Sequence, residues 1–228
     1  MFSTLSLKIA SVTHSTDNDT LTAALARHAI ELADDQIELL ERYCTALWDW
    51  NEKLNLTRHT DYEKFVTRDV IDSLALEPFL DAGQTVLDVG TGGGVPGVIL
   101  AIVRPDLEVT LSESVAKKAR AVDDIVKTLG LTVTVAHARA EALLEADPFD
   151  TLVVRAVAPL SKLLTWFQSH WDHMGRLLVI KGPNWVAERH EARERGLLRK
   201  HELRKLATYV IPGTEAESVI LSVEPKQG

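Results

Sequence analysis

The sequence predicts an α/β fold, in which an open and mostly parallel sheet follows an N-terminal helical extension. Between about residue 34 and residue 76 the apolar residues follow helical spacing in two segments, whereas from Thr85 onward short β-branched segments alternate with helical ones. The first of these segments runs directly into a glycine-rich turn that begins at Gly90. Alternation of this kind is typical of parallel sheets, whose strands are joined by crossover helices.

The helical extension is expected to span residues 20–83, after a poorly ordered N-terminus at residues 1–19. Asp34 or Asp35 can cap its first helix. The apolar positions of that helix follow helical spacing at Ile37, Leu40, Tyr43, Cys44, Leu47 and Trp48. A second helix is predicted from Asp61 to about Leu76, with a buried side formed by Phe65, Val66, Val70 and Leu74.

The remaining residues, 84–228, form the predicted sheet domain. Its strands are predicted at residues 85–89, 108–112, 132–136, 150–154 and 176–181. Its helices are predicted at residues 97–103, 115–129, 159–169 and 185–198. The last two apolar runs, 208–211 and 218–223, are separated by only six residues, which is too short for a crossover helix. They should therefore form an antiparallel hairpin at the C-terminal end of the sheet.

Composition and charge restrict the possible classes of protein. The net charge of −8 lies entirely in residues 1–83, which hold 15 acidic and 7 basic side chains, while residues 84–228 hold 18 of each. A single cysteine, Cys44, excludes an internal disulfide, and the histidines show no metal-ligand spacing. The sequence has no apolar run near the length of a membrane span and no signal-peptide layout. A cytoplasmic monomer without a metal is therefore expected.

The turn after the first predicted strand indicates a small-molecule cofactor site. Glycines such as Gly90 and Gly92 let the backbone approach a ligand, and free amides at the start of the following helix favour polar ligand atoms. Residues 92–97 also fit the G-x-G-x-x-G pattern of dinucleotide sites. Asp88 would repel a pyrophosphate and attract an ammonium group, which favours S-adenosylmethionine over a nicotinamide cofactor. Glu113, after the second strand, is suited to ribose hydroxyls in either cofactor.

Other polar residues follow later strands and should lie at the same edge of the sheet, because the carboxyl ends of parallel strands meet there. Ala140 and Glu141, after the third strand, can line an adenine or simply open a helix. Arg155 ends an apolar strand, where a charge is costly unless it faces a ligand or a partner acid. Lys181 ends the fifth predicted strand.

Several short motifs form a specific combination between about residue 40 and residue 223. They are Asn55-Leu56-Thr57, Arg68 with Asp72-Ser73, Asp88-Val89-Gly90-Thr91-Gly92, Pro96-Gly97, Lys117-Lys118, Arg139-Ala140-Glu141, Arg155-Ala156 and Lys181-Gly182. This combination resembles the RsmG (GidB) family of bacterial methyltransferases. Membership implies a Rossmann-like class I methyltransferase sheet, S-adenosylmethionine as cofactor, and methyl transfer to N7 of a guanine in 16S ribosomal RNA. The implied pocket residues are Gly90, Val95, Ala140, Glu141 and Arg155.

Two positions depart from the pattern of that family. Asp69 follows Arg68 where the family commonly has histidine after arginine, and Glu217-Ser218 stands where an arginine-histidine pair is usual. Both replacements remove potential positive charge from surfaces where we expect RNA phosphates.

The implied reaction depends on positioning, because guanine N7 has a free lone pair and no proton for a general base to remove. We predict that Arg139 and Arg155 act at the pocket as catalytic residues. The predicted contacts to 16S RNA, or to the small ribosomal subunit, are Asn55, Arg68, Lys117, Lys118 and Lys181. The alternatives are a solvated helix turn for the lysine pair, an exposed ion pair with Asp72 for Arg68, and a brace at the helix-to-sheet junction for Asn55.

Two other functions stay open from the sequence alone. A non-catalytic factor of small-subunit assembly could retain the pocket and leave guanine unmodified. A nicotinamide-dependent oxidoreductase should offer residues for hydride transfer, such as a Tyr-x-x-x-Lys pair, and the sequence has none. Tyr43, Tyr62 and Tyr209 all lie outside the segments that follow the predicted strands.

Overall fold

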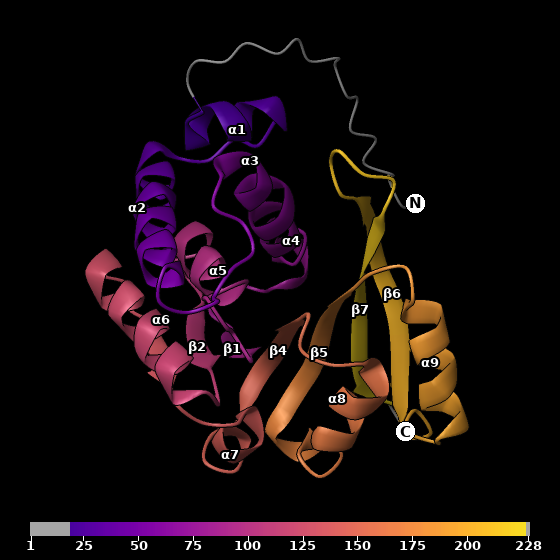
Figure 1. Ribbon diagram of the computed structural model, residues 1–228. Helices are drawn as coiled ribbons and strands as arrows, with labels where there is room; N and C mark the ends of the chain where they lie inside the picture. Colours follow the sequence, from indigo (N-terminus) through magenta and orange to yellow (C-terminus); the bar gives the residue numbers. More distant parts are fainter. Residues whose placement is uncertain (1–18, 227–228) are drawn as a thin grey trace.

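The computed structural model describes residues 19–226 and confirms the predicted α/β class. One seven-stranded sheet has the strand order β3-β2-β1-β4-β5-β7-β6 (Figure 1). The pairs among β1 to β5 are parallel, while β7 runs antiparallel to both β5 and β6. The winding reverses between β1 and β4, so the point of reversal lies beside the glycine-rich turn. The expectation of a poorly ordered N-terminus falls on residues that, up to residue 18, lie outside the described part.

The first five predicted strands and the last one are confirmed within two residues of their expected ends, whereas the strand predicted at 208–211 begins seven residues earlier. They are β1 (Thr85–Val89), β2 (Glu108–Ser112), β3 (Thr134–Ala136), β4 (Phe149–Arg155), β5 (Met174–Lys181), β6 (His201–Val210) and β7 (Glu217–Pro225). The C-terminal hairpin is antiparallel as predicted, but it is longer. Charged side chains such as Glu202 and Arg204 lie on the exposed face of β6, and a register shift between Lys205 and Ala207 interrupts its alternation. Because these features break the alternation of apolar and polar residues, the sequence does not predict the first part of this strand.

The helices also follow the prediction, with a few differences. They are α1 (Leu21–Arg27), α2 (Asp34–Asn51), α3 (Tyr62–Lys64), α4 (Ile71–Leu74), α5 (Gly97–Val103), α6 (Ala116–Leu129), α7 (Ala140–Leu144), α8 (Leu160–Trp166) and α9 (Trp185–Glu194). A π-helical segment, Phe65–Val70, joins α3 to α4, so the second predicted helix is continuous but irregular in its middle. Helix α9 ends earlier than predicted, shortly before Gly196, whose φ of 72° does not continue a helix. Helix α1 was not predicted, and helix α7 was expected only in the alternative in which Ala140 and Glu141 open a helix.

Within residues 19–226, no helix has the length and apolar composition that crossing a bilayer requires.

Alternate residues of the central strands face two different helical layers. Val86 and Val153 belong to the cluster packed by α1, α2, α4, α5 and α6. Leu87 and Leu152 belong to the second cluster, which α7, α8 and α9 cover. Because strand residues alternate with period two, Asp88 points to the same side as Val86, into the layer that contains α2 and α5.

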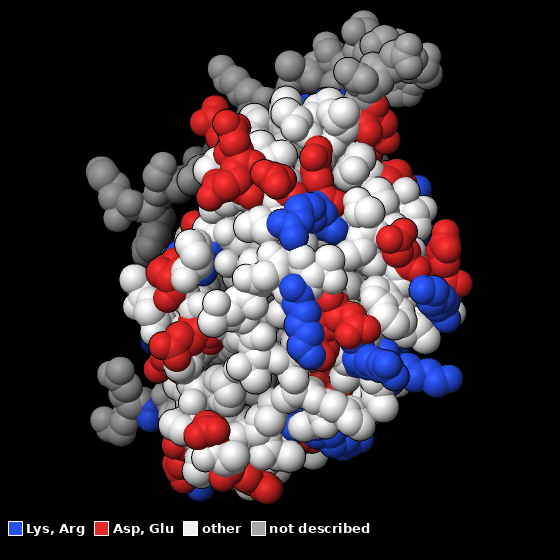
Figure 2. All heavy atoms as spheres, turned by 90° about the vertical axis from the view of Figure 1, so that its left-hand side faces the viewer, with Lys and Arg blue, Asp and Glu red and all other residues white. Residues whose placement is uncertain are grey.

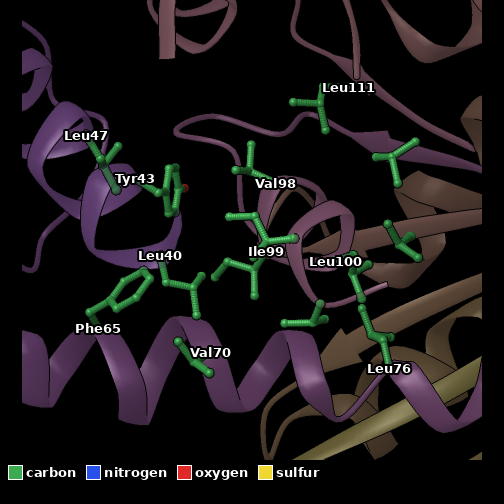
Figure 3. Packing of buried hydrophobic residues seen from close by; sticks show 14 of the residues in the cluster. Leu40, Tyr43, Leu47, Phe65, Val70, Leu76, Val98, Ile99, Leu100 and Leu111 are labelled. Atoms are coloured by element: carbon green, nitrogen blue, oxygen red, sulfur yellow. The ribbon is translucent and has the colours of Figure 1, made fainter. Parts of the chain in front are cut away.

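The helical extension shares its core with the sheet domain. The side chains labelled in Figure 3 come from both parts: Leu40, Tyr43 and Leu47 from α2, Phe65 and Val70 from the π segment, and Val98, Ile99 and Leu100 from α5. Each of them has at most 1% of its surface exposed. Burial of one such side chain contributes about 1.5–3 kcal/mol, so the extension and the sheet stabilise each other.

Asn51 braces the junction between α2 and the segment that follows it. Its Oδ1 accepts hydrogen bonds from the backbone amides of Leu56 and Thr57, each at 2.9 Å. Asn55 is exposed instead. The alternative in which Asn55 braces this junction is therefore wrong. The asparagine that does so is Asn51, four positions earlier in the chain.

We expect Asn51→Ala to lower the free energy of unfolding by about 1–3 kcal/mol, because two backbone amides lose their acceptor. Asn55→Ala is the matched control and should change that free energy by less than about 0.5 kcal/mol. Urea unfolding followed by circular dichroism measures both variants. Equal destabilisation by the two substitutions would contradict this assignment.

Candidate cofactor site

The loop between β1 and α5 is shaped by its glycines. Gly90, Gly92 and Gly94 adopt positive φ angles of 66°, 60° and 110°. A Cβ atom on Gly94 would lie 2.7 Å from Val98 and 3.1 Å from the hydroxyl of Tyr43. Gly90 is exposed, although a Cβ atom on it would lie 3.1 Å from the side chain of Val157. A Cβ atom on Gly92 would meet only the carbonyl oxygen of Gly90, at 4.0 Å. The loop therefore packs inward at Gly94 and presents open backbone at Gly90 and Gly92, as a cofactor cradle requires.

Asp88 lies underneath this loop, and this corrects its predicted direct contact with a cationic ligand group. The residue is only 1% exposed. Its Oδ2 accepts hydrogen bonds from the Thr91 hydroxyl at 2.6 Å and from the Gly97 amide at 2.9 Å. The strand alternation that gives β1 its two faces directs this carboxylate into the protein. Asp88 therefore fixes both ends of the glycine-rich turn.

The environment of Asp88 shifts its titration. Its Oδ1 is buried and has no hydrogen-bond partner among the described residues. Burial raises the pKa of this carboxyl from 3.8 to about 6, although hydrogen bonds from Thr91 and Gly97 oppose the shift. The side chain is thus mainly ionised at neutral pH, and its negative charge lies directly beneath the loop.

Glu113, which follows β2, supports the loop from the side. Its Oε2 accepts the amide of Gly92 at 3.2 Å, and its Oε1 accepts the amide of Val115 at 2.8 Å. A carboxylate has about four acceptor sites, so both oxygens can take a further donor. Ribose hydroxyls are donors of this kind, and an acid at the end of the second strand is where ribose binds in Rossmann-like sheets.

The start of α7 brings three predicted site residues together. Arg139 is the N-cap residue of the helix, and its side chain is 69% exposed. Ala140 is buried in the second helical layer, whereas the side chain of Glu141 is 23% exposed and lies 3.8 Å from Arg139. Ala140 can therefore offer only its backbone to a ligand. Val95 is half-buried in the glycine-rich loop.

Arg155, at the end of β4, is held by two carboxylates of the helical extension. Its Nη2 lies 2.6 Å from Asp69 Oδ1, and its Nη1 lies 3.4 Å from Asp72 Oδ2. Nη1 also donates to the backbone carbonyl of Arg68 at 3.0 Å. Burial disfavours the charged form, but the two carboxylates outweigh it and raise the pKa of Arg155. The partner acids that this charge requires thus come from the helix at residues 62–74.

Two tyrosines outside the strand-ending segments nevertheless contact the site. Tyr43 of α2 is fully buried and donates to the carbonyl of Gly93 at 2.9 Å. Tyr209 of β6 donates to Asp72 Oδ1 at 2.6 Å. The sequence gives no signal for either contact, because each joins elements that are far apart in the chain. The apolar stripe around Tyr43 indicated only that this residue is buried.

One departure from the family pattern, Asp69, pairs with Arg155, and the other lies in the C-terminal hairpin. Asp69 is 2% exposed and Ser218 is 5% exposed, and Ser218 is the cross-strand partner of Tyr209. Only Glu217 is exposed. The expectation that these replacements alter an RNA-facing surface is therefore wrong for Asp69 and Ser218, which are inside the protein.

The predicted RNA contacts differ in their availability. Asn55 and Lys117 are exposed, while Arg68 and Lys118 are half-buried. The lysine pair opens helix α6. Figure 2 shows the face that carries α2 and α6, where acidic side chains gather over the upper part formed by the N-terminal helices. This distribution agrees with the excess of acid in residues 1–83.

Lys181 is engaged within the protein. Its side chain is 11% exposed, and its Nζ lies 2.7 Å from Glu188 Oε2. The same Nζ donates to the backbone carbonyl of Ala158 at 2.6 Å. These contacts join the ends of β4 and β5 to α9. The ammonium group of Lys181 is therefore less available to an RNA phosphate than that of the exposed Lys117 in α6.

Cys44 is buried in the core, as predicted, and burial raises the pKa of its thiol. In the part of the chain that the structure describes, no cluster of three or more His, Cys, Asp or Glu side chains could hold a metal ion.

Comparisons with known proteins agree with this geometry. Residues 36–214 match the GidB family model, described as rRNA small subunit methyltransferase G. A Rhodopirellula baltica protein named Ribosomal RNA small subunit methyltransferase G is 47% identical over 194 residues, which is 85% of this chain and 84% of that protein. A Chromobacterium violaceum protein of the same name is 40% identical over 163 residues, which is 71% of this chain and 78% of that protein.

Solved structures with a similar fold are more distant in sequence. A mutant of MtNAS in complex with S-adenosylmethionine aligns with a TM-score of 0.54 at 16% identity, over 83% of this chain and 72% of that chain. M. capricolum TrmK in complex with S-adenosyl-homocysteine aligns with a TM-score of 0.54 at 8% identity, over 68% of each chain. At such identities the likeness concerns the fold alone.

The strand order, the glycine-rich loop and the acid after β2 define a Rossmann-like fold with a cofactor loop, and the family match makes its class that of a methyltransferase. The family match extends over most of the chain and agrees with this class. The chain belongs to the GidB family, rRNA small subunit methyltransferase G. The predicted family and fold are thereby confirmed, and the nicotinamide-dependent alternative is set aside.

The raised pKa of Asp88 predicts a pH-dependent loss of stability. Because the folded state binds this proton more tightly than the unfolded state, the stabilisation from the protonated carboxyl is lost as pH rises from about 4 through about 6. Asp88→Asn removes this titration. The unfolding free energy of the variant relative to the wild type should therefore rise by up to about 3 kcal/mol over that range.

Urea unfolding at a series of pH values measures this difference. Asp106→Asn is a suitable control, because a hydrogen bond with Arg104 lowers the pKa of Asp106 to about 2, so its difference from the wild type should stay flat above pH 4. A flat profile for Asp88→Asn as well would contradict a raised pKa at Asp88.

Proposed function

We propose that this chain transfers the methyl group of S-adenosylmethionine to N7 of a guanine in 16S ribosomal RNA, as free RNA or within the small ribosomal subunit. The family match and the names of the relatives support a ribosomal RNA substrate. The motifs of the sequence that resemble the family support the choice of guanine N7. The observation that carries the cofactor assignment is the open glycine backbone between two buried acids, Asp88 and Glu113.

The balance of charge near the loop favours a cationic cofactor. Asp69, Asp72, Asp88 and Glu113 contribute four carboxylates that are buried or nearly so, and Asp69 and Asp72 pair with the guanidinium of Arg155. S-adenosylmethionine carries a sulfonium and an ammonium against one carboxylate, so its net charge is positive. A dinucleotide pyrophosphate would be repelled by the same environment.

The residues present fit S-adenosylmethionine. When bound, this cofactor supplies a methyl group on a positively charged sulfur, which is open to direct displacement. We assign its ribose hydroxyls to Glu113 and its adenine to the backbone of Ala140 and the side chain of Glu141. The remaining assigned contacts are Gly90, Gly92, Val95 and Arg155, while Asp88 acts through the shape of the loop.

The protein's contribution to the reaction is to align the guanine with the methyl group. Such alignment can lower a barrier by roughly 7–11 kcal/mol. The guanidinium of Arg139 is exposed at the start of α7, and we assign it to guanine O6 as a hydrogen-bond donor. Arg155 has five N–H donors and keeps some for a ligand beyond its bonds to the protein. We therefore retain both arginines as catalytic residues.

RNA phosphates are assigned to Lys117, Lys118 and Arg68, with Asn55 as a further polar contact. Lys181 is left out of this set, because a phosphate would have to compete with Glu188 for its ammonium group. A protein with a ribosomal substrate would act in the cytoplasm, and this reaction requires only one copy of the chain.

The decisive assay incubates the purified protein and S-adenosylmethionine with unmodified small ribosomal subunits and with free 16S RNA. Nucleoside mass spectrometry should then detect 7-methylguanosine. Subunit binding without modification would indicate the assembly-factor alternative. Binding of NADH in place of S-adenosylmethionine would contradict the cofactor assignment.

We expect replacement of both Lys117 and Lys118 by Gln to weaken RNA binding and leave S-adenosylmethionine binding unchanged. The slope of log K against log salt should become shallower by about 1.4, since each lost phosphate contact removes about 0.7 from it on single-stranded RNA. Lys127→Gln, at the other end of α6, is the control, because that lysine is paired with Asp123. An unchanged slope in the double variant would show that these lysines do not meet phosphates.

A further inference from the structure

Tyr209 connects the C-terminal hairpin to the cluster around Arg155. It lies near the end of β6, the edge strand of the sheet, and its ring is half-buried beside the core formed by α1, α2, α4, α5 and α6. Its hydroxyl donates to Asp72 Oδ1 at 2.6 Å, across 137 positions of the chain. A bond this short to a carboxylate is typical of a strong, charge-assisted hydrogen bond.

Asp72 divides its two oxygens between two partners. Oδ1 accepts the Tyr209 hydroxyl, and Oδ2 lies 3.4 Å from Nη1 of Arg155. The terminal torsion of an aspartate is soft, so one partner alone does not fix the plane of its carboxylate. With Tyr209 on one oxygen, the other is held towards Arg155.

Asp69 completes the enclosure of the guanidinium. Its Oδ1 lies 2.6 Å from Nη2 of Arg155, while the carbonyl of Arg68 accepts from Nη1. Asp69 sits in the π-helical segment and is 2% exposed, so the surrounding helix fixes its position. Asp72 lies farther from the guanidinium and has more exposed surface, at 13% against 3% for the side chain of Asp69. It is therefore the partner whose orientation depends most on a further hydrogen bond.

We propose that Tyr209 is a positioning residue, which acts through Asp72 to orient the guanidinium of Arg155 toward the bound cofactor. The C-terminal hairpin then contributes a residue that shapes the cofactor site. This inference rests on the proposed function, since it concerns the use of Arg155 in binding S-adenosylmethionine.

Tyr209→Phe tests the role of the hydroxyl and leaves the ring in place. The dissociation constant for S-adenosylmethionine, measured by calorimetry, should rise about three- to tenfold, as loss of one hydrogen bond produces. The maximal methylation rate at saturating cofactor should fall less than the affinity. Tyr62→Phe is the matched control, since its ring packs on Trp48 and no hydrogen bond of its hydroxyl is found within residues 19–226. It should leave the affinity unchanged.

A double substitution separates positioning from general support of the fold. Arg155→Lys should itself weaken cofactor binding, because a lysine cannot reproduce the forked contacts of the guanidinium. If Tyr209 acts through Arg155, adding Tyr209→Phe to Arg155→Lys should change the dissociation constant by less than about twofold. A merely structural role would give the same factor in both backgrounds.

Three results would overturn this inference: an unchanged affinity in Tyr209→Phe, an unchanged affinity in Arg155→Lys, or equal factors with and without Arg155. Thermal melts of all variants verify that each is folded at the temperature of the titration. If the proposed function itself were wrong, the wild-type protein would bind no S-adenosylmethionine, which distinguishes that outcome from the three results above.

Discussion

A largely buried guanidinium is costly unless carboxylates pair with it, and this requirement at Arg155 links the helical extension, the central sheet and the C-terminal hairpin. The arginine ends a central strand, its acids Asp69 and Asp72 come from the helical extension, and Tyr209 of the C-terminal hairpin holds the second acid. Removing one partner from such a cluster typically costs about 3–5 kcal/mol, because a buried charge is left uncompensated. The extension and the hairpin are therefore built into the site and are not separate appendages.

The glycine-rich loop depends on the same layer of the protein. Asp88 holds the loop from below through Thr91 and Gly97, and Tyr43 of α2 holds it through the carbonyl of Gly93. The close approach of Tyr43 and Val98 to Gly94 leaves no space for a side chain there. The shape of the loop is thus set by residues that need not contact the ligand.

The sequence predicted the fold well because the signals of the fold are local. Strand and helix periodicity, the glycine-rich turn and the short link before the hairpin each depend on neighbouring residues, and each appears in the structure. The contacts of the candidate site residues were predicted less well than the fold. The inward direction of Asp88 follows from strand alternation and could have been read from the sequence. The pairing of Arg155 with Asp69 and Asp72, and the bond from Tyr209, arise only when distant segments pack together.

The central claim is that an open glycine backbone above buried acids binds a cationic methyl donor. A crystal structure of the protein with S-adenosylmethionine tests it most directly. The account predicts that the ligand lies on the loop at Gly90 and Gly92, that its ribose hydroxyls donate to Glu113, and that Asp88 stays beneath the loop. A ligand bound elsewhere, or a ribose that does not contact Glu113, would contradict the account.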